Sequence, residues 1–195
     1  MELLTHISDE VREIGACNCI KIERTPDGTP CLIGHNTDVI GFERSIQPML
    51  QPWHKKALVL GTGGASKAVA YGLCRLGVEP TLVSRIPSDP PQRKKTEVLS
   101  YSDLTEDVVR DHTVIVNCTP LGTFPKVDGC PDIPYHLLTE QHLLYDLVYN
   151  PDKTLFLQKG EAHGATVKNG LEMLHLQAEA GWEIWGKESI AAIKS

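Results

Sequence analysis

A glycine-rich turn at residues 58–70 constrains the fold of this chain more than any other feature. Its sequence, LVLGTGGASKAVA, reads as an apolar strand, a turn and the start of a helix. Gly61 lets the chain leave the strand, and Gly63 has no side chain, so a pyrophosphate can approach the backbone at the positive end of the helix. Ser66, another small residue, stands where G-x-G-x-x-G has its third glycine. This context favours a dinucleotide-binding loop; the alternative is a glycine-rich turn without a ligand.

Strands and helices alternate through the rest of the chain after residue 55. Alternation of this kind is typical of an α/β fold, in which a parallel sheet is covered by helices on both faces. Together with the glycine turn, it predicts a Rossmann-like sheet flanked by helices. The expected strands are 57–61, 80–85, 113–118 and 143–149, and the expected helices are 64–77, 153–164 and 169–185.

Residues 1–52 form a shorter first zone with a different pattern. Apolar residues at three- and four-residue steps predict a helix over residues 3–14. Pro and Asp-Gly between two apolar runs predict a hairpin of strands 16–23 and 31–36. A helix is expected over 38–50, with Pro48 and Pro52 ending it.

The end of the second strand in the sheet predicts which dinucleotide is bound. An NAD enzyme usually carries an acidic residue there, which accepts bonds from the ribose hydroxyls. This chain has Ser84 and Arg85, followed by Arg93, Lys94 and Lys95. A guanidinium can bind a phosphate through two parallel hydrogen bonds, so the sequence favours NADP over NAD. The alternative is a solvated basic loop, which suits Arg93, Lys94 and Lys95 better than Arg85.

Other polar residues stand where strands end. Asn117 and Thr119 follow an apolar run, at the sheet edge where ligands bind in open α/β folds; they could contact the ribose or nicotinamide, or cap the loop. Thr37 or Asp38 could be a routine helix N-cap or part of a site. Asn18 is polar within an apolar strand, and it too could have a structural role or be part of a site.

Composition limits the classes of partner. The net charge is −6, from 25 acidic and 19 basic residues, whereas binding to nucleic acid favours a basic surface. No apolar run approaches the roughly 20 residues of a membrane helix, and the first residues do not form a secretory signal. Neither the cysteines nor the histidines have metal-site spacing. We expect a soluble cytoplasmic protein that binds small molecules, with no metal, no nucleic acid and no membrane.

Six blocks of sequence resemble the shikimate dehydrogenase family, in its order and at its spacing. The resemblance implies reduction of 3-dehydroshikimate to shikimate with NADPH, in the biosynthesis of aromatic amino acids through chorismate. The blocks are ACN (16–18), GHNTDVIGFERSI (34–46), LGTGGASKA (60–68), VNCTPLGT (116–123), YDLVYNP (145–151) and NGLEMLHLQA (169–178).

The resemblance also implies roles for individual residues. Asp38 would be the acidic half of the catalytic pair and would contact substrate, as would Asn18, Tyr149 and Gln177. Arg85 matches the arginine of the family's N-R-T, although Ser84 and Ile86 flank it here. The cofactor-binding set would be Gly61, Thr62, Gly63, Gly64 and Ala65 at the pyrophosphate, Ser84 and Arg85 at the 2′-phosphate, and Thr119, Leu147 and Gly170 toward the ribose and nicotinamide.

Family members begin with a further segment that these 195 residues do not contain. It carries a serine pair for the substrate carboxylate and a V-T-x-P-x-K motif whose lysine is the main proton donor. Two explanations fit the missing segment. The sequence is a fragment or has a misplaced start, or it is a truncated natural paralogue. The resemblance divides the chain into a remnant of the substrate-binding domain (1–52), an NADP-binding domain (53–168) and a C-terminal helix (169–195), in a monomer or homodimer. The alternatives are a non-catalytic NADP-binding module and a quinate dehydrogenase paralogue.

Overall fold

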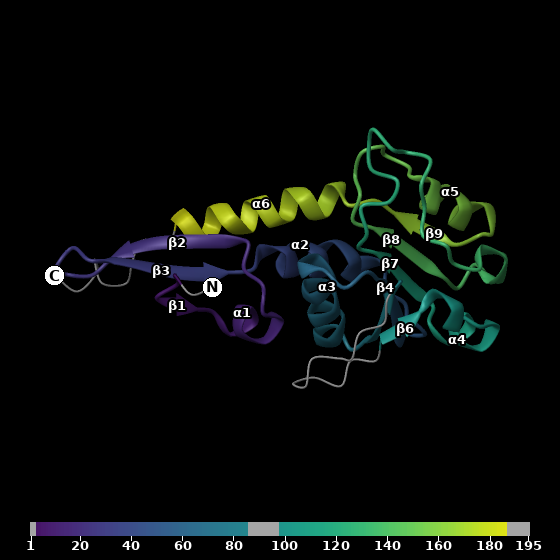
Figure 1. The fold of residues 1–195 in the computed structure, drawn as a ribbon, viewed down its shortest axis with the longest axis horizontal. Helices are drawn as coiled ribbons and strands as arrows, with labels where there is room; N and C mark the ends of the chain where they lie inside the picture. The colour runs from purple at the N-terminus through teal and green to yellow at the C-terminus, as the bar shows by residue number, and fades with distance from the viewer. Residues whose placement is uncertain (1–2, 86–97, 187–195) are drawn as a thin grey trace.

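The computed structural model describes residues 3–85 and 98–186, which form two sheets bridged by helices (Figure 1). The larger sheet has six strands in the order β6-β5-β4-β7-β8-β9, and every neighbouring pair is parallel. The predicted α/β fold with a Rossmann-like parallel sheet is therefore confirmed. The strands are β4 (Lys56–Leu60), β5 (Glu79–Ser84), β6 (Val98–Ser100), β7 (Val114–Asn117), β8 (Leu143–Asp146) and β9 (Thr166–Lys168).

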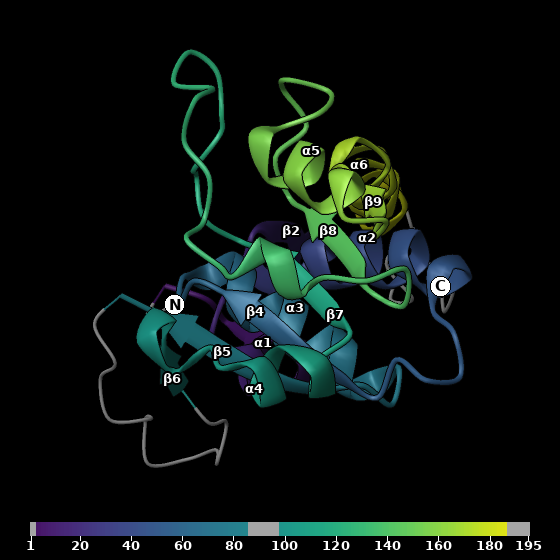
Figure 2. The ribbon, with the colours of Figure 1, turned by 90° about the vertical axis from the view of Figure 1, so that its right-hand side faces the viewer.

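The strand order changes direction between β4 and β7. From β4 the chain adds β5 and β6 on one side, and then returns to add β7, β8 and β9 on the other. The long connection after β7 extends beyond the sheet (Figure 2). In open α/β sheets, ligands bind at the carboxyl ends of the strands where the order reverses. A ligand site is therefore expected at the residues that follow β4 and β7.

Successive side chains of each strand point to opposite faces of this sheet, and both sets are apolar. Helices therefore cover both faces. Ala57 and Val59 of β4 pack into one core cluster, while Leu58 and Leu60 pack into the other. The first cluster includes α2 (Thr37–Ile46), α3 (Gly64–Arg75) and α6 (Leu171–Gly186); the second includes α4 (Glu106–Asp111) and α5 (Leu155–Ala162). None of the helices in residues 3–85 and 98–186 has the length and apolar character needed to cross a membrane.

The smaller sheet has the order β1-β3-β2 and lies on the far side of α2 and α3 from the larger one (Figure 1). Strands β2 (Cys19–Arg24) and β3 (Pro30–His35) form the predicted antiparallel hairpin, and β1 (His6–Ile7) pairs parallel to β3. Between β1 and β2, α1 (Asp9–Ile14) packs toward α3 through Ile14 and Ala68.

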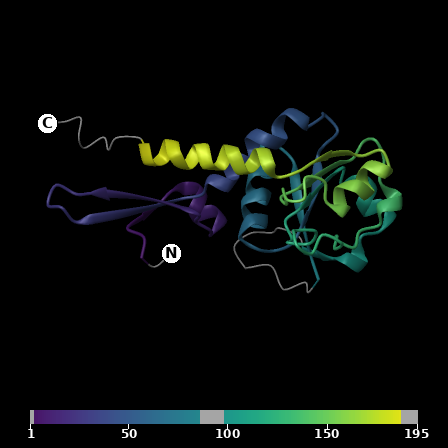
Figure 3. The ribbon, with the colours of Figure 1, turned by 90° about the horizontal axis from the view of Figure 1, so that it is seen from above.

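Helices α2 and α6 join the two sheets. They cross closely at Gly41, where an added Cβ would lie 2.7 Å from the Met173 carbonyl oxygen and 3.0 Å from the Gln177 nitrogen. Beyond the crossing, α6 runs alongside the small sheet (Figures 1 and 3), and Trp185 Nε1 donates to the Ile20 carbonyl at 3.1 Å. One helix therefore contacts the core of the large sheet and the outer strand of the small one.

Several boundaries differ from the sequence expectation. The helix predicted over 3–14 begins only at Asp9, because Ser8 caps it and the residues before it pair with β3. The helix predicted over 38–50 ends at Ile46 and continues as the 3₁₀ helix η1 (Gln47–Met49), which contains Pro48. Three strands and one α-helix of the described residues were not predicted: β1, β6, β9 and α4, each of six residues or fewer. Arg93, Lys94 and Lys95 lie outside the described residues. The remaining 3₁₀ helices are η2 (Tyr101–Asp103) and η3 (Tyr135–Leu137).

Candidate active site

The turn after β4 has the geometry of an anion-binding loop. Gly61 has a φ of +113°, a conformation that favours glycine, and an added Cβ there would lie 3.2 Å from Ser66 Oγ. Gly63 is the N-cap of α3, with no side-chain capping bond, and an added Cβ there would meet no atom within 4 Å. The first amides of α3 and its positive dipole end are thus open to an anion. Thr62, Gly63 and Gly64 are exposed, and Ala65 is half-buried.

Ser84 and Arg85 lie beside this turn because β5 is the neighbour of β4. The Gly61 amide donates to the Val83 carbonyl at 2.8 Å, one residue before Ser84. Arg85 is exposed just beyond the strand. Its guanidinium acts on Tyr101 in η2: burial, the larger effect, raises the pKa of Tyr101, and the Arg85 charge lowers it. Arg85 therefore lies exposed at the carboxyl end of the strand next to β4.

Asn117 at the end of β7 organises the loop rather than facing a ligand. It is fully buried, and its Oδ1 accepts from the Thr119 amide at 3.0 Å and the Thr119 hydroxyl at 2.7 Å. Of the two interpretations of this pair, the structure supports loop capping for Asn117. The Thr119 methyl group would be 3.5 Å from a Cβ at Gly61, so Thr119 borders the glycine turn.

Leu147 and Gly170 meet at the carboxyl end of β8. An added Cβ at Gly170 would lie 2.1 Å from the Leu147 carbonyl oxygen, so only glycine fits there. The Gly170 amide donates to the Val148 carbonyl at 3.2 Å, and the Leu147 amide donates to the Asn117 carbonyl at 3.0 Å. These contacts bring two residues predicted at the nicotinamide against one another. Tyr149 follows on the same loop and is 48% exposed.

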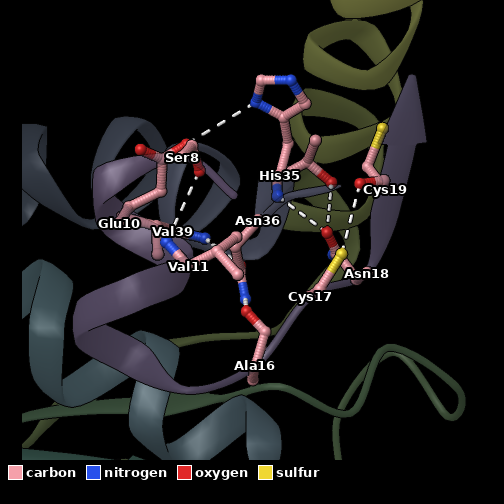
Figure 4. Close-up of polar contacts among 11 residues, drawn as sticks. Ser8, Glu10, Val11, Ala16, Cys17, Asn18, Cys19, His35, Asn36 and Val39 are labelled. Carbon is pink, nitrogen blue, oxygen red and sulfur yellow. Dashed lines mark hydrogen bonds and ion pairs between the residues drawn. The ribbon is translucent and has the colours of Figure 1, made fainter. Parts of the chain in front are cut away.

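Asn18 connects the hairpin to the start of α2 (Figure 4). Its Oδ1 accepts from the Thr37 amide at 2.8 Å, and its side chain acts on the Asp38 carboxylate, whose pKa it lowers. Asn36, not Thr37 or Asp38, is the N-cap of α2: its Oδ1 accepts from the Val39 amide at 3.4 Å and its Nδ2 donates to the Ala16 carbonyl at 3.0 Å. Of the two interpretations of Thr37 and Asp38, the helix N-cap was therefore wrong, and the Asp38 carboxylate has no capping role.

The pKa of the Asp38 carboxyl is raised by partial burial, the larger effect, while the bond from Asn18 lowers it. Gln177 reaches the same cluster from α6: the Thr37 hydroxyl donates to its Oε1 at 3.2 Å. Three residues predicted to contact substrate, Asn18, Asp38 and Gln177, are therefore brought together. A Cβ at Gly64 would lie 3.9 Å from the Ala16 Cβ, so the segment that leads to Asn18 adjoins the glycine turn.

Comparison with known proteins shows the family of this chain. A shikimate dehydrogenase (NADP(+)) from Caldicellulosiruptor saccharolyticus is 32% identical over 199 residues, covering 95% of this chain and 67% of the relative. The chain belongs to the shikimate dehydrogenase family. No protein-family profile matches the chain.

Solved structures of this family share the fold over nearly the whole chain. The Thermus thermophilus shikimate 5-dehydrogenase, in complex with NADP(H) and shikimate, is 32% identical with a TM-score of 0.74, covering 94% of this chain and 67% of that one. A Corynebacterium glutamicum quinate dehydrogenase in complex with NAD is 26% identical with a TM-score of 0.79, covering 99% and 71%. The chain spans about two thirds of the length of its curated relatives.

Two features of this member of the shikimate dehydrogenase family were missed from the sequence. The first is the bridge that Thr37 forms between Asn18 and Gln177: the sequence offered Thr37 as a cap or a site residue, with no sign of these partners. Asp146 is a fully buried carboxylate at the end of β8; an acidic residue inside the apolar run LLYDLVY was a signal that could have found it. Across the described residues, no three His, Cys, Asp or Glu side chains form a group that could hold a metal ion.

Proposed function

We propose that the chain provides the NADP-binding unit and part of the substrate site of an oxidoreductase that reduces 3-dehydroshikimate to shikimate. The observation that carries this proposal is the cluster of Asn18, Asp38 and Gln177 beside the glycine turn. It brings carboxylate and amide groups, which suit a polyhydroxylated ring, next to a loop suited to a pyrophosphate. The assignment of residues 1–52, 53–168 and 169–195 to three units, the cytoplasmic location and the role in chorismate biosynthesis are parts of the same proposal.

The residues of the glycine turn fit the cofactor. Gly61 and Gly63 leave room for phosphates at the start of α3, and Arg85 supplies a charge for the 2′-phosphate. NADPH, when bound, supplies the hydride for the ketone carbon. Leu147 and Gly170 would line the nicotinamide, and Thr119 would border the ribose. Ser84, at the end of β5, would contact the 2′-phosphate beside Arg85.

Substrate contacts would come from the other half of the site. Asp38, held by Asn18, would accept a hydrogen bond from a ring hydroxyl and would orient the ring beside the nicotinamide. Gln177 would donate through its amide, and Tyr149 would close the site from the loop after β8. Positioning of this kind contributes separately from the chemical step. These residues would thus fix the position of the ketone carbon relative to the nicotinamide.

The reduced oxygen must also gain a proton. The family resemblance assigns that donor to a lysine in the V-T-x-P-x-K motif, which is absent from these 195 residues. A positioned general acid contributes about 10²–10⁴-fold to a rate. Asp38 replaces the lysine poorly, because its role requires the ionised form, which has no proton to give.

The test is turnover by a polypeptide of these 195 residues, followed through NADPH absorbance with 3-dehydroshikimate. We expect NADPH binding with turnover at least about a hundredfold slower than that of a full-length family member. Supplying the N-terminal segment of a relative, fused or in trans, should restore turnover, and Asp38→Asn should then lower it again. Normal turnover by the 195 residues alone would show that another residue donates the proton.

Two alternatives are tested by the same preparation. The shared fold with an NAD-bound quinate dehydrogenase favours a trial of quinate and shikimate with both NAD⁺ and NADP⁺; preference for quinate with NAD⁺ would replace the proposed substrate and cofactor. A chain that binds NADP⁺ but stays inactive after the N-terminal segment is supplied would be a non-catalytic NADP-binding module.

A further inference from the structure

The carboxylate of Asp146 is the most completely enclosed charged group near the proposed cofactor site. It lies at the carboxyl end of β8 with no exposed surface. Three donors point at it: Asn117 Nδ2 at 2.9 Å and the Val148 amide at 3.0 Å bind Oδ1, and the Thr154 hydroxyl at 2.5 Å binds Oδ2. A buried carboxylate with three donors is matched in its ionised form, in which it only accepts.

Each of the three donors holds a different segment. Asn117 ends β7 and fixes the loop that starts at Thr119. Val148 belongs to the loop after β8, and its carbonyl accepts from the Gly170 amide. Thr154 is the N-cap of α5. One side chain therefore ties together the segments that carry Thr119, Leu147 and Gly170.

We propose that Asp146 is the positioning residue of the nicotinamide end of the site, and that its ionised form holds the Leu147–Gly170 contact in the geometry that receives the cofactor. This inference rests on the proposed function, because that function places NADP against these residues. Asp146 itself, fully buried behind the loop, contacts no ligand.

Burial, the dominant effect, raises the pKa of Asp146 to about 6, and the bonds from Thr154, Val148 and Asn117 lower it. Below that pH the proton sits most favourably on Oδ2, and the Thr154 hydroxyl must accept instead of donate. The bonds from Asn117 and Val148 then lose their charge assistance. While Asp146 stays buried, the loop should therefore loosen locally as the pH falls through about 6, although global unfolding becomes less favourable.

The other titratable groups around Asp146 do not explain such a step. Cys118, after β7, and Tyr135, in η3, are coupled to it, but burial raises the pKa of both, so both stay neutral across the range from about pH 5 to about pH 8. The charged side chains on the elements packed nearby are exposed or paired: Lys159 over the Tyr135 ring, Glu161 with Lys153, and Lys168 with Glu172.

The experiment measures the dissociation constant of NADP⁺ between about pH 5 and about pH 8 by calorimetry, for the unmodified chain and Asp146→Asn. Asparagine keeps the shape and can donate from Nδ2 to Thr154, so it imitates the protonated state. We expect the variant to bind roughly fivefold more weakly at the higher pH and equally at the lower. The ratio of the two constants cancels the titration of the 2′-phosphate, which is common to both. A ratio that does not change with pH would overturn the proposal.

Two further variants separate positioning from a merely structural effect. Thr154→Val removes a donor to the ionised form, so it should move the midpoint of the pH step upward. Asp107→Asn changes an exposed carboxylate on α4 that pairs with Arg110, and should leave both the affinity and the step unchanged. A midpoint that Thr154→Val does not move would contradict the assignment of the step to Asp146.

A measurement made without cofactor separates a failure of this inference from a failure of the proposed function. If the unmodified chain fails to bind NADP⁺ at the higher pH, the proposed function fails. Amide exchange at Leu147 and Val148, through local openings that leave Asp146 buried, still tests Asp146 in that case: relative to intrinsic exchange, protection should be lower in Asp146→Asn at the higher pH and equal in the two proteins at the lower. Equal protection at both pH values would overturn the positioning role.

Discussion

At the scale of single residues, Arg85 is expected to set the choice of cofactor. Charge-assisted hydrogen bonds contribute about 1.5–3 kcal/mol, so Arg85→Ala should weaken NADPH binding roughly 10- to 150-fold. Binding of NADH, which lacks the 2′-phosphate, should be nearly unchanged. Fluorescence titration of both cofactors measures this, and Arg110→Ala, which removes an exposed arginine on α4, is the matched control. An equal loss for the two cofactors would show that Arg85 does not bind the 2′-phosphate.

Asp146 should make stability depend on pH with a definite sign. Its pKa is about 6 in the folded chain and about 3.9 in an unfolded chain. Between these values the folded state binds more protons, so the free energy of unfolding falls as the pH rises. The loss amounts to about 3 kcal/mol at about 1.36 kcal/mol per pH unit.

Asp146→Asn cannot ionise and should remove this loss. Urea unfolding should therefore give the variant a larger free energy of unfolding than the unmodified chain at about pH 8, and a similar one at about pH 4. Asp107→Asn should show no such difference. A variant less stable at the higher pH would mean that the three hydrogen bonds outweigh the burial of the charge.

At the scale of elements, the crossing of α2 and α6 depends on Gly41. A Cβ there would lie 2.7 Å from the Met173 carbonyl oxygen, so Gly41→Ala must force the helices apart. We expect a loss of about 1–3 kcal/mol of unfolding free energy, typical of overpacking. Gly181→Ala, in α6 with open space around the added Cβ, is the matched control and should gain about 0.5–1 kcal/mol from helix propensity.

Separation of α2 from α6 should also disturb the proposed substrate contacts. The Thr37 hydroxyl on α2 bonds Gln177 on α6 one turn from the crossing, so Gly41→Ala should weaken substrate binding more than cofactor binding. A variant as stable as the control, with the same substrate affinity, would show that the crossing adjusts without moving the site.

At the scale of the whole molecule, the two sheets should differ in local stability. The inner strands of the large sheet, β5, β4, β7 and β8, have neighbours on both sides, and helices cover both faces of that sheet. In the small sheet, β1 and β2 are edges within the described residues, and Ile20 and Ile22 are 46% and 67% exposed. Exposed backbone and few buried apolar contacts lower the free energy of local opening.

Hydrogen exchange should therefore be early in residues 1–35 and slow in 57–61 and 113–118. The measurement is native-state exchange followed by mass spectrometry or NMR. Equal protection in both regions would mean that another chain covers the small sheet, since an apolar face of that kind is normally an interface.

The sequence by itself determined the parts of this protein that depend on local physics. Continuous apolar runs predict strands buried on both faces, and Gly61 and Gly63 predict the loop, because a positive φ and a close approach each need glycine. The shorter elements β1, β6, α4 and β9 carry too few residues for a periodic signal. The sites followed less directly: Asn18, Asp38 and Gln177 were assigned through motifs, not through any contact visible in the chain.

Only the tertiary structure decided which polar groups meet. Thr37 and Gln177 are 140 residues apart, and their bond exists because α2 and α6 cross at a glycine. Asp146 reads as an interruption of an apolar strand, yet three segments enclose it and hold it as an acceptor. The physical reason is the same in both cases: apolar burial and backbone geometry are encoded within a few neighbouring residues, whereas the partner of a polar group is fixed by how distant elements pack.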